Sequence, residues 1–430
     1  MPAKVQLDII VVGAGLGGLA AAIALRRGGH NVTILEQAVA LGEVGAGIQI
    51  PPNSSRILMK WGLKEKMENH AVIPKALMLR GYKDGKILST QNLVPYTQDV
   101  YKGPYWHVHR ADFHNTMVQA ARDLGVKIQL NSCVTSIDFS APSVTLKTGA
   151  TVAADLIIGA DGLKSRCREE MMGRADPPHL TGDLAYRIIV KADEMRKDPD
   201  LRELTEDPAI NFWMGPDAHA ACYLLKGGGL YNIVLLCPDN MPADVHIMTT
   251  GPEEVRDFFK TWDPRLGKLL NMVHEVSKWR LQNSREMETW LHPEGKFVLL
   301  GDACHATLPY LAQGAAMAVE DGAVLGGLLE RLEDRAQLKG LLAAYESLRK
   351  KRTTRIVLES THQRDVFHLP DGPVQEARDA ELLRDELKPG FPNKWRDPEF
   401  QKFLFGYDAF AEVETAWARF KSEGSVNSML

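Results

Sequence analysis

A glycine-rich turn near the start of the chain constrains the fold more than any other feature. Residues 5–12 (VQLDIIVV) form a nearly continuous apolar run, which is typical of a strand buried on both faces of a parallel sheet. The turn GAGLGG follows at once, and residues 16–27 then repeat apolar side chains at helical spacing. Residues 31–37 (NVTILEQ) predict the next parallel strand. Together these segments predict one βαβ unit.

The turn has GxGxxG spacing through Gly13, Gly15 and Gly18. The first glycine permits the tight turn, the second lets the backbone approach a pyrophosphate, and the third lets helix and strand pack closely. The N-terminus of the helix attracts the anion. Glu36 ends the second strand, where a carboxylate accepts hydrogen bonds from ribose hydroxyls and disfavours a 2′-phosphate. The turn alone leaves FAD and NAD open as occupants.

Two distant segments favour FAD. In residues 154–168 a buried strand leads to Asp161-Gly162 and then to a helix that follows Ser165. In residues 296–314 a buried strand ends at Gly301-Asp302, and a helix begins near Gln313-Gly314. Asp302 at such a strand end can accept a hydrogen bond from a ribityl hydroxyl. The helix start at Gly314 and Ala315 can place positive dipole near the flavin ring, which becomes anionic on reduction.

These motifs, in this order, resemble the group A flavoprotein monooxygenases, the p-hydroxybenzoate hydroxylase-like family, and most closely enzymes of the salicylate hydroxylase type. The resemblance covers about residues 7–365. It implies that Glu36 holds the adenosine ribose, that Asp161-Gly162 serves FAD and NAD(P)H, and that Asp302 binds the ribityl chain. Residues 45–53 (GAGIQIPPN), with Gly47, also match the family.

A further match lies at residues 109–112 (HRAD), whose Arg110 would lie over the FAD. The chain departs from the family at Ala306, where many relatives have proline. The resemblance implies no function for the last 65 residues.

The resemblance also implies a reaction. FAD would use NAD(P)H and O2 to hydroxylate an electron-rich ring, phenolic or salicylate-like, through a flavin C4a-hydroperoxide. Pro309, with Tyr310 and Leu311, would line the substrate pocket. No second GxGxxG and no CxxxxC pair occurs in the sequence, so a disulfide reductase is not expected. The same chemistry on an indole or polyketide ring, by hydroxylation or epoxidation, stays an alternative, as does a non-enzymatic binding protein of this fold.

Arg187 and Tyr223 are the expected substrate contacts. Arg187 lies in the strand-like run AYRIIVKA, where its guanidinium could hold a carboxylate or phenolate. The alternatives are a strand arginine paired with an acid and, for Tyr223, a core tyrosine. His305 is interpreted as a core histidine, while Arg168 could pair with a nearby acid and Asp302 could cap a helix. No metal site is expected.

Residues 181–290 carry short strands between Gly, Pro and Asp turns and predict a second sheet. Residues 78–100 are expected as strands with turns, and residues 126–148 as an antiparallel meander. The predicted class is α/β: a Rossmann-like FAD-binding domain with a parallel sheet, interrupted by a smaller α+β substrate domain, plus a helical C-terminal segment. The expected parts are FAD-binding 1–78, 106–180 and 291–365, substrate domain 79–105 and 181–290, and C-terminal segment 366–430.

Composition bounds the partners and the compartment. The formal net charge is −4, with 51 basic and 55 acidic residues interleaved, which argues against a broad nucleic-acid surface. The five cysteines are scattered and are expected as buried thiols of a reducing compartment. The sequence contains no run of about 18 apolar residues, so no membrane span is predicted. A cytoplasmic protein is expected. The tripeptide at 428–430 leaves a peroxisomal address open, and a homodimer also stays open.

Overall fold

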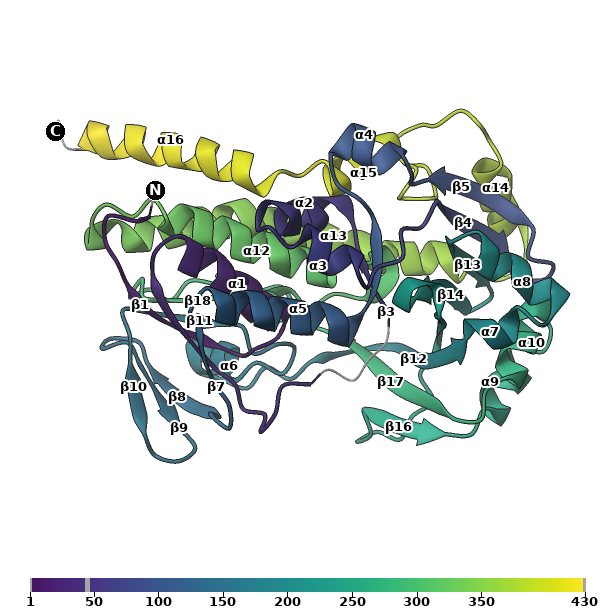
Figure 1. Ribbon diagram of the computed structural model, residues 1–430, viewed down its shortest axis with the longest axis horizontal. Helices are drawn as coiled ribbons and strands as arrows, with labels where there is room; N and C mark the ends of the chain where they lie inside the picture. The colour runs from purple at the N-terminus through teal and green to yellow at the C-terminus, as the bar shows by residue number, and fades with distance from the viewer. Residues whose placement is uncertain (1, 43–46, 428–430) are drawn as a thin grey trace.

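The computed structural model describes residues 2–42 and 47–427, with side chains to residue 422. Figure 1 shows a parallel sheet with its helices at one end of the molecule and a larger mixed sheet at the other. The helices α12 (Gly314–Leu329), α13 (Leu338–Phe367) and α16 (Ala409–Asn427) lie along one side. The predicted α/β class with a parallel sheet and a helical C-terminal region is confirmed.

The first sheet is built around the predicted βαβ unit. β1 (Asp8–Val12) is its middle strand, α1 (Leu16–Arg27) follows the glycine turn, and β2 (Asn31–Leu35) pairs in parallel. The strand order is β18-β11-β1-β2-β7, and every pairing is parallel. The carboxyl ends of these strands therefore meet at one edge. The other strands are β7 Lys127–Gln129, β11 Leu156–Gly159 and β18 Phe297–Leu299.

The second sheet has eight strands in the order β16-β17-β12-β15-β14-β13-β4-β5. Its pairings are antiparallel except for that between β13 and β4. One face packs on the apolar side chains of short helices and forms a core of its own. The strands are β4 Ala76–Gly81, β5 Ile87–Asn92, β12 His179–Lys191, β13 Ala209–Gly215, β14 Ala218–Leu225, β15 Leu230–Pro238, β16 Ile247–Thr250 and β17 Val276–Asn283.

Two smaller sheets and several helices complete the chain. β8 (Val134–Asp138), β9 (Ser143–Leu146) and β10 (Thr151–Ala153) form an antiparallel meander, and β3 (Gly47–Ile50) pairs with β6 (Trp106–His109). The helices between strands are α2 Pro52–Lys60, α3 Lys64–Glu68, α5 Arg110–Asp123, α6 Arg166–Met172, α7 Ala192–Met195, α8 Pro199–Glu206, α9 Glu253–Phe258, α10 Pro264–Asn271 and α11 Asp302–His305.

Two expectations about local structure are wrong. Residues 127–129 do not join the meander, because β7 pairs in parallel with β2 at the edge of the first sheet. Residues 78–100 do not consist only of strands with turns, because α4 (Tyr96–Tyr101) follows β5. Its Tyr96 and Tyr101 hydroxyls donate to Gln401 of the C-terminal segment. Tertiary contacts thus override the strand propensity of this tyrosine- and valine-containing stretch.

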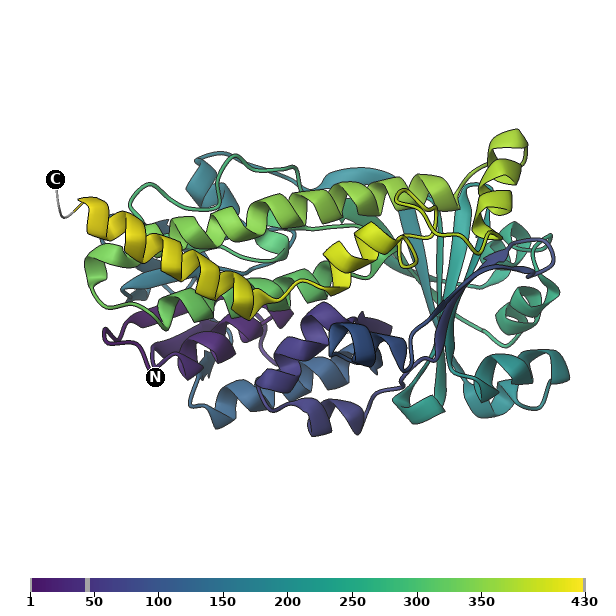
Figure 2. The ribbon, with the colours of Figure 1, turned by 90° about the horizontal axis from the view of Figure 1, so that it is seen from above.

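The C-terminal segment packs into the core of the molecule. After α14 (Pro373–Leu382), α15 (Pro398–Phe405) and the loop before it place Trp395 and Phe405 in one apolar cluster with the second sheet. The Trp395 ring stacks on Phe212 of β13 at a centroid distance of 5.2 Å. Figure 2 shows α13 running from the end of the first sheet to the second sheet, with the C-terminal segment beside it.

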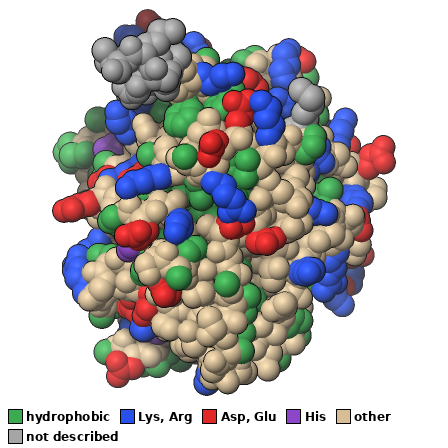
Figure 3. Space-filling model, turned by 90° about the vertical axis from the view of Figure 1, so that its left-hand side faces the viewer, with side chains coloured by type: hydrophobic (Ala, Val, Ile, Leu, Met, Phe, Trp, Pro, Cys, Tyr) green, Lys and Arg blue, Asp and Glu red, His purple; other side chains and the backbone are tan. Residues whose placement is uncertain are grey.

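The surface mixes both charges. Figure 3 shows basic and acidic side chains interspersed over one end of the molecule, as the interleaved sequence predicts. Within residues 2–42 and 47–427, no helix combines the length and apolarity that crossing a bilayer requires. Four of the five thiols are buried, Cys133 is half-buried, and none is in a disulfide.

A cluster of buried charges joins α12 to α13. Glu320 and Asp321 are fully buried on α12, and Arg349 of α13 contacts them at 2.7 Å each. Arg352, one turn further along α13, contacts Glu320 at 2.8 Å. Because each carboxylate has arginine partners, the cluster tolerates removal from water as a unit but not the loss of one member.

We therefore expect Arg349→Met to lower the free energy of unfolding by about 3–5 kcal/mol, because it leaves buried carboxylate charge uncompensated. Urea denaturation at fixed FAD concentration measures this loss. The control is Lys4→Met at the exposed pair Lys4–Glu333, which should change the free energy of unfolding far less, because water screens this pair. Equal losses in the two variants would contradict this account of the cluster.

Candidate functional site

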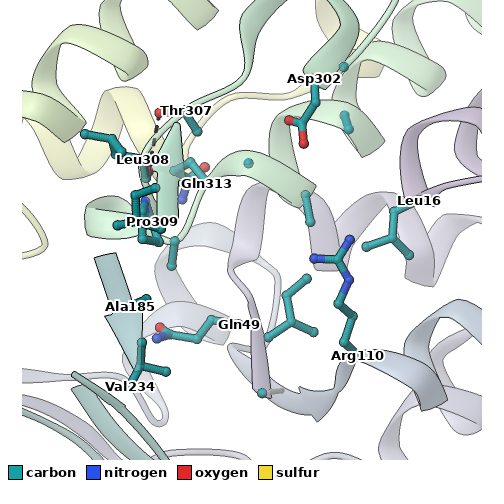
Figure 4. Close-up of a pocket in the computed structure, with 18 of the residues that line it drawn as sticks. Leu16, Gln49, Arg110, Ala185, Val234, Asp302, Thr307, Leu308, Pro309 and Gln313 are labelled. Carbon is teal, nitrogen blue, oxygen red and sulfur yellow. Dashed lines mark hydrogen bonds between the residues drawn. The ribbon is translucent and has the colours of Figure 1, made fainter. Parts of the chain in front are cut away.

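A cavity of about 430 Å³ lies between the strand ends of the first sheet and one face of the second. Its wall comes from the glycine turn, from β3, from the start of α5, from the second sheet and from the segment between β18 and α12. Figure 4 shows Leu16, Arg110 and Asp302 toward one side, and Leu308, Pro309 and Gln313 toward the other, near Ala185 and Val234. The cavity therefore extends from the glycine turn, of the kind that binds phosphate groups, to a face of the second sheet.

Most of the expected site residues line this cavity. They are Gly15, Gly47, Arg110, Gly162, Arg187, Tyr223, Asp302, Pro309, Gly314 and Ala315. The segments that the sequence placed far apart thus meet in one place. Gly13, Gly18, Glu36 and Asp161 are not part of the cavity lining. Of the matching stretch at residues 45–53, Gly45 and Ala46 lie outside the described residues.

The glycines of the turn face different surroundings. A Cβ at Gly18 would clash with the carbonyl oxygen of Gly13, so this position serves the packing of α1 on β1. Gly13 has a φ of +105° and lies against the Ala160 carbonyl. A Cβ at Gly15 would meet no described atom within 4 Å, and Gly15 lines the cavity. Gly15 thus leaves the space that a pyrophosphate would occupy beside the N-terminus of α1.

Two of the expected acids make bonds within the protein. Glu36 accepts from the backbone N–H groups of Ala14 and Ala38, both at 2.8 Å. It therefore lies at the end of β2, against the glycine turn, where a ribose could share its oxygens. Asp161 accepts from the Ser165 hydroxyl at 2.5 Å and from the Cys167 N–H at 3.0 Å. Its side chain orders the start of α6, and the backbone of Gly162 forms the wall instead.

The segment after β18 supplies the opposite wall. Asp302 is the first residue of α11, and Gly301 is the N-cap of this helix. The alternative that Asp302 is itself an N-cap is therefore wrong by one residue. The expectation for residues 309–311 is only partly right. Pro309 lines the cavity, whereas the buried Tyr310 donates to Asp183 at 2.7 Å and Leu311 packs in the apolar cluster around Trp395. A short 3-10 turn at Pro309–Leu311 rotates these two side chains away.

Two residues have the structural roles that the sequence suggested for them, an ion pair with an acid and a core histidine. Arg168 is 1% exposed and pairs with Asp176 at 2.8 Å. Buried His305 contacts Asp321 through Nε2 at 2.6 Å. Neither lines the cavity. Among the described residues, no group of three or more His, Cys, Asp or Glu side chains could hold a metal.

The second sheet presents alternate side chains to the cavity. Ala185 and Arg187 come from β12, and His219, Ala221 and Tyr223 come from β14. This is the period of two that puts side chains on one face of a strand. The Arg187 guanidinium lies over the Trp279 ring, 4.3 Å from its centroid. Tyr223 is 3% exposed, and burial raises the pKa of its phenol, which therefore keeps its proton.

The sequence reasoning missed His219. Its Nδ1 lies 2.8 Å from Nε2 of His368, which follows the last turn of α13. Burial lowers the pKa of His219 well below its usual value, and His368 lowers it further. Burial also lowers the pKa of His368, to about 4, with a smaller contribution from Arg364. The spacing of His219, Ala221 and Tyr223 along one strand could have indicated a shared face.

Gln49 and Gln313 were also missed. Gln49 lines the cavity from β3 and accepts a hydrogen bond from the Tyr105 hydroxyl at 2.7 Å. Gln313 is 1% exposed and lines the cavity at the N-terminus of α12. Nothing local in the sequence distinguishes these glutamines from surface ones, because their positions depend on the assembled wall.

A family model described as an FAD binding domain matches residues 6–360. The chain belongs to this FAD-binding family. It is 43% identical over 421 residues to the FAD-dependent monooxygenase OpS4 of Beauveria bassiana, a match that spans 96% of this chain and 98% of that protein. It is 32% identical to 3-hydroxybenzoate 6-hydroxylase of Polaromonas naphthalenivorans, over 94% and 96% of the two chains. This flavoprotein is thus a monooxygenase of the group that includes aromatic hydroxylases.

A solved structure described as a salicylate hydroxylase substrate complex shares the fold. Its TM-score is 0.80 at 23% identity, and the match covers 96% of this chain and 98% of that one. The predicted resemblance to the aromatic monooxygenase family is therefore confirmed.

The residues of the cavity fit FAD. The open space at Gly15 beside the start of α1 suits a pyrophosphate. Glu36 lies beside the glycine turn, at the end of β2, where the adenosine ribose of such a cofactor would lie. Asp302 could accept from the ribityl chain, and the N-terminus of α12 at Gly314 offers positive dipole to the ring. These individual roles remain predictions.

Replacing Gly15 and Gly18 separately should separate cofactor binding from folding. Gly15→Ala should weaken FAD binding by at least about tenfold, because the methyl group occupies the pyrophosphate space. Gly18→Ala should instead cost about 1–3 kcal/mol of stability through overpacking against Gly13. Titration of flavin fluorescence and denaturation of the apoprotein measure the two effects. A Gly15→Ala variant with unchanged FAD affinity would show that the pyrophosphate lies elsewhere.

Proposed function

We propose that the protein hydroxylates an electron-rich aromatic ring, phenolic or salicylate-like, with NAD(P)H and O2 as co-substrates. The observation that carries the proposal is the continuity of the cavity, which joins the glycine turn to a sheet face bearing Arg187, His219 and Tyr223. A ring held on that face would lie in the same cavity as a flavin held at the other end, and would face it. When bound and reduced by NAD(P)H, FAD supplies with O2 the electrophilic oxygen for such a ring.

The sheet face suits an aromatic ring in shape and polarity. Ala185, Val234 and Leu236 form an apolar floor, and Phe212 and Leu281 flank it. Such a lining excludes water, which protects a reactive oxygen donor from hydrolysis and strengthens each polar contact. Arg187 at this floor can hold a carboxylate or phenolate oxygen. Tyr223, which keeps its proton, can donate a hydrogen bond to the same substrate.

His219 is the residue best placed to accept the proton of a ring hydroxyl. Nδ1 is taken by His368, so Nε2 is the atom that would act on a substrate. The lowered pKa keeps His219 neutral at neutral pH, so in the tautomer that carries its hydrogen on Nδ1 the Nε2 atom can accept a proton, as a weaker base than a free imidazole. Transfer of the hydroxyl proton to Nε2 leaves a phenolate, whose ring carbons are more nucleophilic.

Oxygen incorporation tests the reaction class. With the phenolic acid that most stimulates NAD(P)H oxidation, turnover under 18O2 should place one heavy oxygen on the ring, as measured by mass spectrometry. Product formed in H2 18O under ordinary O2 should carry none. Oxidised product without the heavy atom in the first experiment would exclude a monooxygenase acting on that ring.

Arg187→Ala should raise the dissociation constant of that phenolic acid at least about tenfold, because the charge-assisted hydrogen bond is lost. Arg187→Lys should give a smaller loss, since it keeps the charge without the planar fork. FAD content, read from the flavin absorbance, should not change. Loss of flavin in Arg187→Ala would place this residue at the cofactor instead.

His219→Asn should lower kcat about 10²- to 10⁴-fold, because asparagine can keep the bond to His368 but cannot replace Nε2. The loss should shrink as pH rises toward the pKa of the free phenol, about 10, where the substrate ionises without a base. A pH–rate profile of the variant beside the parent measures this. A loss that is constant over the whole pH range would count against a base role.

A further inference from the structure

We propose that Asn53 is a positioning residue that holds the Gln313 side chain with its NH2 group toward the cavity. Gln313 then donates a hydrogen bond to an acceptor oxygen on the ring substrate and sets a preference for acceptors over donors at that position. The inference rests on the proposed function, because it takes the cavity to hold a substituted aromatic ring.

The network begins at a side chain that sequence reasoning treated only as part of a matching stretch. Asn53 lies in the first turn of α2 and is 1% exposed. Its Nδ2 lies 2.6 Å from Oε1 of Glu320 and 3.0 Å from Oε1 of Gln313. One amide group thus bridges the buried charge cluster and the cavity wall.

Glu320 decides which way the Asn53 amide points. Burial alone would raise the pKa of Glu320, but Arg352 and Arg349 hold it below its usual value. The carboxylate is therefore ionised and can only accept hydrogen bonds. Asn53 must turn its NH2 group toward it, because the opposite orientation would place an amide oxygen against the carboxylate. Asn53 Oδ1 is left without a partner among the described residues.

The orientation of Asn53 decides that of Gln313. The second N–H of Asn53 needs an acceptor, and the Gln313 oxygen provides it. The reversed Gln313 amide would bring two donor groups together. Gln313 Nε2 is consequently left over, buried and with no hydrogen-bond partner in the part of the chain that the structure describes. This assignment follows from the chemistry of the network and not from the appearance of the amide.

An unpaired buried donor is destabilising, and an acceptor in the cavity would relieve that cost. Gln313 lies with Leu308 and Pro309, on the side of the cavity near Ala185 and Val234 and away from Leu16 (Figure 4). That is the sheet-face end, where the proposed function places the substrate. An oxygen of the substrate is therefore the acceptor that we assign to Gln313.

The C-terminal segment holds the other end of the network. Arg352 donates to the backbone carbonyls of Phe403 and Leu404 at 2.6 and 3.0 Å while it pairs with Glu320. The end of α15 thus positions the arginine that keeps Glu320 ionised. Through Glu320 and Asn53, a segment that does not itself line the cavity fixes the direction of one hydrogen bond within it.

The test compares two probes in the FAD-loaded, full-length enzyme. 3-Hydroxybenzoate offers an acceptor oxygen on the ring, whereas the amino group of 3-aminobenzoate is mainly a donor. Dissociation constants come from the change in flavin absorbance on titration. The parent should bind the hydroxy compound at least about tenfold more tightly. Asn53→Leu should reduce this ratio to within a few-fold of one, and Gln313→Glu, whose carboxylate only accepts, should reverse it.

Asn393→Leu is the matched control. Asn393 is also fully buried and hydrogen-bonded, but its Nδ2 donates to Ser89, which is not a member of the network. Its loss of stability should be similar, and its binding ratio should equal that of the parent. If Asn53 had a purely structural role, Asn53→Leu would lower stability and FAD content without changing the ratio of the two dissociation constants.

The outcomes separate the two claims. Binding of both probes with a ratio unchanged in Asn53→Leu would overturn the positioning role and leave the proposed function standing. A parent ratio near one would overturn the donor role of Gln313. Failure of both probes, and of other phenolic acids, to bind at all would overturn the proposed function and this inference together.

Discussion

The close approach of backbone to backbone at the glycine turn is the contact on which the site depends. Because the first sheet is parallel, the turns that follow β1, β11 and β18 leave the same edge. Gly18 allows α1 to begin directly against Gly13, and Gly13 lies against Ala160 at the end of β11. Bulkier residues would push these turns apart. Three segments that are more than a hundred residues distant in sequence then form one continuous wall.

The elements with strong periodic patterns could be predicted from sequence. The expected helix at 16–27 has the same bounds as α1, and the helix expected near Gly314 begins there. The edge strand β7 was misassigned because alternation in a short run does not reveal whether its partner is parallel or antiparallel. α4 was missed because contacts with Gln401 outweigh local propensity.

The site shows the same division. Gly15 was expected at the site from the glycine spacing, and Gly162 from the strand-to-turn motif that resembles the family; both line the cavity. Residues whose role depends on a partner were not expected. His219 contacts His368 of α13's C-terminal end, and Gln313 accepts a hydrogen bond from Asn53 of α2. Side chains brought together across such separations leave no pattern in the sequence that a reader could recognise without the fold.

α13 has a mechanical consequence for how ligands reach the cavity. It is a single helix of 30 residues, and a helix of that length spans about 45 Å. Arg349 near its middle is locked into the first core, while His368 just beyond its end contacts a strand of the second sheet. A continuous helix held at both places resists bending between the part of the molecule that contains the first sheet and the part that contains the second. We therefore expect entry and exit of small molecules to depend on displacement of short surface segments more than on a hinge that opens the molecule as a whole.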